Sequence, residues 1–318
     1  MAHMIEMIDG KAQMAYAGET PWHGLGVKVP ADLTSDQMLE AAGLNWSVRK
    51  IPAFANVAGK NVAIGHSALV RDLDDKILDV VSNDWIPVQN QDAFDFFSEF
   101  VDAGDMEMHT AGSLRDGQIV WGLAKVKESF ELFKGDQIDS YLLFTNFHKY
   151  GFSTDVRFTP IRVVCNNTLT LSLNSTVERM VKFSHRKEFD ASEVKNMLGI
   201  ATDKLAKYKE MASFLGSKKA KDENVVDYFK RVFPAVGQKG KSDEMSRNAK
   251  IAMDILHTQP GHEYAEGTWW QPFNAVTFMT DHVIGRTADN RLSSAWYGQN
   301  KNLKTKALET AIEMAEAA

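Results

Sequence analysis

Aromatic and cationic side chains alternate over residues 146–162 (NFHKYGFSTDVRFTPIR), a pattern typical of proteins that bind single-stranded nucleic acid. Aromatic rings stack on bases, and Lys and Arg side chains neutralise phosphates. His148 counts as a further cation here, and His185 belongs to a second basic cluster that follows. The alternative is a half-buried hairpin whose rings pack inward, and the sequence favours neither interpretation. The predicted nucleic-acid contacts are Phe147, Lys149, Tyr150, Phe152, Arg157, Arg162, Lys182, Arg186 and Lys187.

The segment 235–242 (AVGQKGKS) fits a relaxed phosphate-loop pattern, with Ala235 in place of the first glycine. In such a loop Lys241 would reach the terminal phosphate of a nucleotide and Ser242 would hold magnesium. The motif needs a buried strand before it, but the preceding VVDYFKRVFP has the pattern of an amphipathic helix. A basic loop between helices is therefore favoured over an ATP site. In that case Lys239 and Lys241 would extend the nucleic-acid-binding surface.

No residue cluster in the sequence forms a recognised catalytic or metal-binding motif. His257 and His262 are separated by a Pro-Gly turn, which does not place them on one helical face, so a polar turn is favoured over a metal site. The single cysteine, Cys165, excludes an internal disulfide and is predicted to be a small buried residue. We therefore expect no catalytic residue and no cofactor, and a binding protein is favoured over an enzyme.

The strand and helix patterns of the sequence predict an α+β fold, with a β-rich N-terminal half and a helical C-terminal half. These elements must position the candidate residues. The N-terminal half is expected to hold an antiparallel sheet with a hairpin, whose Asp116-Gly117 step supplies the positive φ angles of a type I′ turn. A helix over residues 90–101 interrupts the strands, and Asn90 can cap its first turn. Strands are predicted over residues 45–54, 66–72, 76–82, 138–147 and 152–165.

The second half of the chain has the 3.6-residue periodicity of helices. Apolar residues repeat over three heptads between Val194 and Leu215, which predicts a core-facing helix, with a subunit contact in a homo-oligomer as the alternative. Two regions are therefore expected: a mainly β region over residues 1–188 and a helical region over 189–318, packed on the same core. Further helices are predicted over residues 224–232, 242–256, 273–284 and 303–317.

The charge of the chain is unevenly distributed. The 318 residues carry a net charge of −6, but residues 179–250 hold 17 Lys and Arg against 10 Asp and Glu. Such a basic stretch can contact a polyanion, although charge alone favours a solvated helical surface. The sequence contains no run of 18 apolar residues and no secretory signal pattern. We therefore expect a cytoplasmic protein with no membrane partner.

Four segments resemble the phage/plasmid-like protein family, which contains a domain of unknown function, number 932. They are MAHMIEMIDGKAQMAYAGETPWHGLG, AGSLRDGQIVWGLAKV, RVVCNNTL and FNAVTFMTDHVIGRTADNRLSSAWYGQNKNLKTKAL, and they span nearly the whole chain. The resemblance implies a bacteriophage, prophage or plasmid origin and a bacterial host cytoplasm, and it brings no catalytic residues. The predicted order of a helix, a hairpin, further strands and a long helix is similar in outline to phage single-strand annealing proteins, which hold DNA in a basic groove beside a β-hairpin.

Three functions follow as hypotheses. The leading one is single-stranded DNA binding without sequence preference, in annealing or recombination, as a homo-oligomer. The second is a protein-interaction module that binds and inhibits or redirects a host protein. The third is a nucleotide-dependent enzyme that uses the 235–242 loop.

Overall fold

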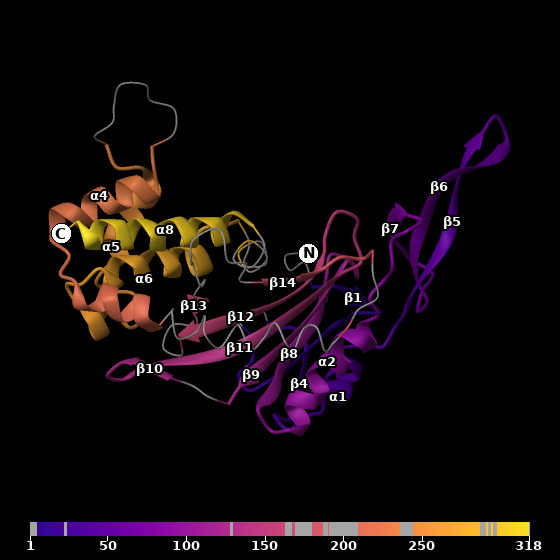
Figure 1. Ribbon diagram of the computed structural model, residues 1–318, viewed down its shortest axis with the longest axis horizontal. Helices are drawn as coiled ribbons and strands as arrows, with labels where there is room; N and C mark the ends of the chain where they lie inside the picture. The colour runs from indigo at the N-terminus through magenta and orange to yellow at the C-terminus, as the bar shows by residue number, and fades with distance from the viewer. Residues whose placement is uncertain are drawn as a thin grey trace.

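The computed structural model describes residues 5–21, 24–127, 130–162, 167–168, 180–186, 190, 209–235, 244–286, 291, 294 and 298–317. Its architecture is α+β, as predicted: antiparallel sheets with hairpins form the N-terminal half, and helices form the C-terminal half (Figure 1). The predicted boundary at residue 188, most of the apolar repeat over 194–215, and Cys165 lie outside the described residues.

The main sheet has the order β13-β12-β11-β9-β8-β3-β4, and β10 and β14 pair with β11 and β12. Neighbouring strands are antiparallel except β3 and β4. The small hairpin of β1 and β2 lies beside this sheet. The strand bounds are β1 Met7–Ile8, β2 Lys11–Ala12, β3 Met14–Ala17, β4 Val27–Val29, β8 Met106–Leu114, β9 Ile119–Val126, β10 Phe130–Phe133, β11 Asp136–Phe147, β12 Thr154–Arg162, β13 Asn167–Thr168 and β14 Met180–Phe183.

Both faces of this sheet bury side chains, so most residues of β9 and of β11 are buried, the polar Thr145 and Asn146 included. Helices α1 (Ser35–Ala41) and α2 (Asn90–Asp102) cover one face, where Leu142 and Phe144 join the largest core cluster (Figure 1). Alternate residues such as Leu143 and Phe147 point to the other face, into a smaller cluster that includes Ile5 from the N-terminal segment.

The β8–β9 connection is longer than the predicted two-residue turn. Pairing ends at Leu114 and Ile119, and the left-handed conformation covers Arg115, Asp116 and Gly117, with φ angles of 51°, 58° and 92°. A Cβ atom at Gly117 would lie 2.8 Å from Nη1 of Arg71. The glycine is therefore required by the close approach of Arg71 as well as by the turn.

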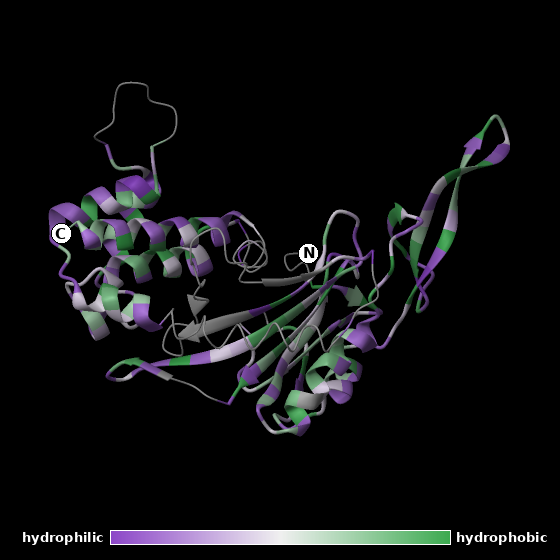
Figure 2. Ribbon diagram, viewed as in Figure 1, coloured by the Kyte–Doolittle hydropathy of each residue, from purple (hydrophilic) through white to green (hydrophobic). Residues whose placement is uncertain are grey.

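A second, three-stranded sheet has the order β5-β6-β7, with bounds β5 Val48–Val57, β6 Lys60–Arg71 and β7 Ile77–Ser82. Strand β7 pairs only with residues 66–70 of β6, so the outer parts of β5 and β6 pair with each other alone. This outer part, residues 53–65, extends away from the main sheet as a two-stranded ribbon (Figure 1). Figure 2 shows hydrophobic residues along both of its strands.

The helical region has its own core cluster, which also includes Leu132 and Ile138 from β10 and β11. The Phe133 ring lies 5.8 Å from the Trp270 ring, so the β10–β11 hairpin joins the two regions. In the centre, Lys304 is fully buried, with Nζ 2.5 Å from Oδ1 of Asp281. Residues 209–217 are also helical. The named helices are α4 Asp222–Val232, α5 Arg247–Ile255, η1 His262–Ala265, α6 Trp270–Phe278, the π-helical turn η2 Met279–Val283 and α8 Gln299–Glu316.

Candidate nucleic-acid interface

The two predicted basic segments lie side by side. Strand β14 pairs antiparallel with the start of β12, with Phe183 opposite Thr154 and Lys182 opposite Asp155. Residues 184–186, which follow β14, therefore lie beside the connection between β11 and β12, residues 148–153. Sequence reasoning predicted both segments, and the sheet pairing brings them to the same end of the sheet.

Four side chains of this end form what we call the turn surface: the half-buried Lys149 and the exposed Tyr150, Phe152 and Arg186. Tyr150 and Phe152 are 57% and 45% exposed, and the Arg186 side chain is 81% exposed. The Nζ atom of Lys149 lies 5.8 Å from the centre of the Phe152 ring. Aromatic and cationic groups thus occur together on the turn surface, as binding to bases and phosphates requires.

The other predicted nucleic-acid contacts are not part of the turn surface. Some of them bond to neighbouring residues of the fold, and others lie on strands or outside the described residues. Phe147 is only 3% exposed and stacks under Phe152, with ring centres 5.1 Å apart, so it supports Phe152 from the core. Arg157 donates to both carboxylate oxygens of Asp155, at 2.9 and 2.6 Å, and its side chain is 11% exposed. Arg162 and Lys182 are strand residues of β12 and β14. Lys187, Lys239 and Lys241 lie outside the described residues.

A network of buried polar side chains supports the turn surface from below. Asn146 donates from Nδ2 to the carbonyl of Val88 at 2.8 Å, and its Oδ1 accepts from the Thr154 hydroxyl at 3.1 Å. His148 donates from Nε2 to Oδ1 of Asn90 at 2.9 Å. All four of these side chains have 0–1% exposure. The two ends of the β11–β12 connection are therefore tied to each other and to the start of α2.

Asn90 has a different role from the helix cap that was predicted. Its Nδ2 donates to the carbonyl of Leu44 at 3.0 Å, while its Oδ1 accepts from His148. The predicted cap is wrong because the side chain points into the core, where these buried polar groups need partners.

His148 is held in its neutral form. Burial, and to a smaller extent the nearby His185 and Arg71, lower its pKa to about 3. Because Nε2 donates to Asn90, Nδ1 carries the lone pair, and it is a buried atom without a hydrogen-bond partner among the described residues. His148 therefore positions the turn, and the expectation that it acts as a surface cation is wrong.

His185 fixes the second segment in a similar way. Its ring stacks on Trp85 at 3.9 Å, and its Nδ1 donates to the carbonyl of Ile86 at 3.0 Å. Burial lowers the pKa of His185, and the bond to Ile86 opposes that effect. With His185 buried, the next residue, Arg186, is directed to the surface, with Nε 3.8 Å from Oδ2 of Asp84.

Two carboxylates border the turn surface. Oδ2 of Asp79 accepts from the backbone N–H of Tyr150 at 2.9 Å, which ties the turn to β7. Asp84 faces Arg186, and the pKa of Asp84 is lowered by hydrogen bonds to Ser82 and to its own backbone and, to a smaller extent, by Arg186 and Lys50. The turn surface is therefore surrounded by charges of both signs, and Asp84 competes with any bound anion for Arg186.

Residues 77–296 match the family model described as Domain of unknown function (DUF932), which covers more than two thirds of the chain. The chain belongs to this DUF932 family. Searches of curated proteins and of solved structures found no match. The matched range includes the turn surface and helices α4 to α6, whereas strands β5 and β6 precede it.

Within the DUF932 match, the 235–242 segment lacks the setting of a phosphate loop. Helix α4 precedes it, and α5 begins only at Arg247, capped by Ser246, whose Oγ accepts from the N–H of Ala249 at 3.2 Å. The predicted helix start at residue 242 is therefore wrong, and a phosphate loop would need its helix to begin at that point.

Metal clusters and membrane-spanning helices are both absent from the residues that the structure describes. No group of three or more His, Cys, Asp or Glu side chains in that part of the chain could hold a metal ion. Nδ1 of His257 lies 3.2 Å from the Nε2 donor of Gln271, in keeping with a polar turn. In the same residues, no helix is long and apolar enough to cross a membrane.

Proposed function

We propose that this DUF932 protein binds single-stranded DNA, without sequence preference, through the turn surface. The observation that carries the proposal is the pair of exposed rings, Tyr150 and Phe152, together with the exposed Arg186 and the half-buried Lys149, on a buried polar support. Unpaired bases offer their faces for stacking, whereas bases in a duplex are covered by their neighbours. The surface therefore suits a single strand better than a duplex.

Each side chain has a distinct role in this proposal. Tyr150 and Phe152 stack on successive bases, while Lys149 and Arg186 contact the phosphates between them. Arg157 acts indirectly, because its ion pair with Asp155 fixes the strand below the surface. Phe147 supports the Phe152 ring. Arg162, Lys182, Lys187, Lys239 and Lys241 are proposed as further phosphate contacts along the path of the strand.

The biological setting is also part of the proposal. A phage or plasmid origin, as the resemblance implies, fits a protein that handles the element's own DNA in the bacterial cytoplasm. Annealing or recombination is the proposed process, since both require single strands to be held with their bases accessible. A homo-oligomer would bind several segments of one strand.

Fluorescence anisotropy with a labelled oligothymidine tests the proposal. The double substitution Tyr150→Ala with Phe152→Ala is expected to weaken binding by about tenfold or more, because stacking on one base contributes about 1–3 kcal/mol. Phe54→Ala is the matched control, since Phe54 is as exposed as Tyr150 but lies on the β5–β6 ribbon. No binding of the wild-type protein at low salt would refute the proposal.

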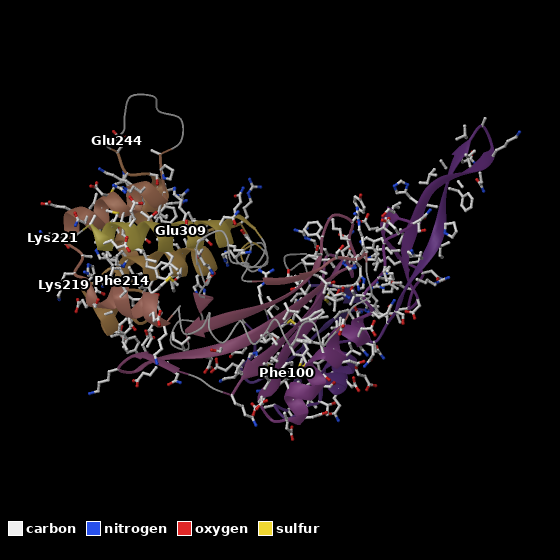
Figure 3. The ribbon with its side chains drawn as sticks, in the orientation of Figure 1. Phe100, Phe214, Lys219, Lys221, Glu244 and Glu309 are labelled. Atoms are coloured by element: carbon white, nitrogen blue, oxygen red, sulfur yellow. The ribbon has the colours of Figure 1, made fainter. Side chains whose placement is uncertain are left out.

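The salt dependence of binding distinguishes a direct phosphate contact from an effect of the net charge of the protein. Arg186→Ala should reduce the slope of log K against log salt by about 0.7, the value for one phosphate of a single strand. Arg231→Ala is the control: Arg231 is also exposed and paired with a carboxylate, Glu313, but lies in the helical region. Figure 3 shows Lys219 and Lys221 in that region, at the opposite end from the ribbon, as further control positions. Equal losses for Arg186 and Arg231 would contradict a localised interface.

A further inference from the structure

The outer part of the β5–β6 ribbon exposes an unusually apolar surface. Val57, Val62 and Ile64 are 57%, 49% and 46% exposed. Ala55 lies opposite Val62 in the register, and residues two apart along a strand point the same way. These side chains therefore lie on one face of the ribbon, which we call the ribbon face. Phe54 points to the other side.

Such a ribbon is poorly stabilised on its own. An isolated two-stranded hairpin is marginally stable in water, and exposed apolar strands are sites of association. The base is firmly held, because Arg71, at the end of β6, bonds to Glu6 at 2.7 Å and lies over the Trp46 ring at 5.1 Å. The outer residues, in contrast, have solvent on the ribbon face in the single chain.

We propose that the ribbon face packs against the ribbon face of a second copy of this chain, related by a two-fold axis. Pro52 lacks a backbone donor and interrupts the hydrogen-bonding pattern of β5, which disfavours pairing of two β5 edges. Packing of face against face needs no backbone donors and covers all the exposed aliphatic side chains at once. In a two-fold contact each ribbon supplies the surface that the other needs.

The charges of the ribbon match this arrangement. Lys60, at the tip, is the sole charged residue within 53–65, so two ribbons do not repel along their length. The β6–β7 turn at the base carries Asp72, Asp74 and Asp75, all exposed. Asp74 pairs with Arg71 and Asp75 with Arg49, whereas Asp72 forms no ion pair among the described residues. An antiparallel arrangement of two ribbons, each about 30 Å long, places the tip of one beside the base of the other. Each Lys60 then meets the acidic turn of the partner.

Sedimentation velocity and light scattering over a range of protein concentrations, without DNA, test this interface. The wild type is expected to form a dimer. Val62→Lys should weaken the dimer by about tenfold or more, because the contact would bury an unpaired charge. Val27→Lys is the matched control, since Val27 is 52% exposed and lies on β4. Far-ultraviolet circular dichroism checks that each variant is folded.

A charge exchange tests the antiparallel alignment. Lys60→Glu should weaken the dimer, and adding Asp72→Lys to it should restore the association. A wild type that stays monomeric at every concentration would overturn the proposal, as would equal effects of Val62→Lys and Val27→Lys. A failure of Asp72→Lys to restore association would overturn the alignment. These measurements contain no nucleic acid, so their failure is distinct from a failure of DNA binding.

Discussion

The β11–β12 turn and the β5–β6 ribbon both present large side chains to solvent, but they are supported in opposite ways. Beneath the turn, Asn146, His148 and Asn90 form a buried hydrogen-bonded network, so the exposed rings have a fixed position. The ribbon has a firm base at Arg71 and an apolar outer part that no described residue covers on the ribbon face. A rigid mixed surface suits a polar ligand that must be oriented, whereas an apolar surface suits association with a similar surface.

The largest expected effect comes from breaking the base of the ribbon. Arg71 and Glu6 are 1% and 2% exposed, and Glu6 also accepts from the Ser113 hydroxyl at 2.7 Å. Arg71→Ala leaves the Glu6 carboxylate buried without its cation, so we expect a loss of about 3–5 kcal/mol in the free energy of unfolding. Urea denaturation followed by tryptophan fluorescence measures it.

Arg49→Ala provides the control for this substitution. Arg49 also pairs with an aspartate at the ribbon base, Asp75, but the two side chains are 53% and 77% exposed. Exposed pairs contribute about 0–1 kcal/mol, so this variant should be nearly as stable as the wild type. Similar losses in both variants would mean that burial does not distinguish the two pairs.

The buried network beneath the turn should make stability depend on pH. The folded protein keeps His148 neutral down to a pKa of about 3, whereas the unfolded chain takes up the proton near pH 6.5. The unfolded state therefore binds more protons below pH 6.5, and stability falls as the pH falls. One such histidine contributes a slope of about 1.4 kcal/mol per pH unit, or about 2 kcal/mol between pH 6.5 and pH 5.

His148→Gln separates this effect from the other histidines. The variant removes one titrating group, so its stability should decrease less steeply between pH 6.5 and pH 5, whatever its stability at pH 7. His185 and His109 also have lowered pKa values and should retain part of the slope. Unfolding midpoints in urea at several pH values give the two slopes. Parallel curves would show that His148 does not titrate with unfolding.

A smaller effect is expected from Asp84, the carboxylate beside the turn surface that should lower its affinity for an oligonucleotide. Asp84→Asn removes the negative charge that faces Arg186, so affinity for an oligonucleotide should rise by about two- to fivefold at low salt. The gain should shrink as salt increases, because these charges are exposed. Asp254→Asn makes the same charge change at an exposed position of α5. An equal gain for Asp254→Asn would indicate a general effect of net charge.

Much of the fold could be predicted from the sequence because its elements have strong local patterns. The helix predicted over residues 90–101 and the strand predicted over 138–147 correspond to α2 and β11. The outer ribbon was missed, since residues 55–65 lack the usual turn signature. Its turn places Ala58 and Gly59 at φ angles of 51° and 81°, and an alanine in the left-handed region is uncommon.

The candidate site was predicted only in part, because sequence spacing does not reveal burial. Phe147 could have been assigned to the core from the alternation with Leu143, which points to the same face. His148 could not, because a histidine directly after a strand has the same local sequence whether it is a buried, neutral hydrogen-bond donor or a surface cation. Its partner Asn90 is 58 residues away, and only the packing of α2 on the sheet brings the two together.

The smallest expected effect distinguishes the two ends of strand β6. Val62→Thr keeps the branched shape on the exposed ribbon face, so in the dilute monomer it should change the unfolding free energy by less than about 0.5 kcal/mol. Val70→Thr places a hydroxyl at a position that is 5% exposed and should cost about 1–3 kcal/mol. Thermal unfolding at low protein concentration compares the two variants. If Val62→Thr costs as much as Val70→Thr, the ribbon face is already covered within the single chain, and a second copy is not needed to cover it.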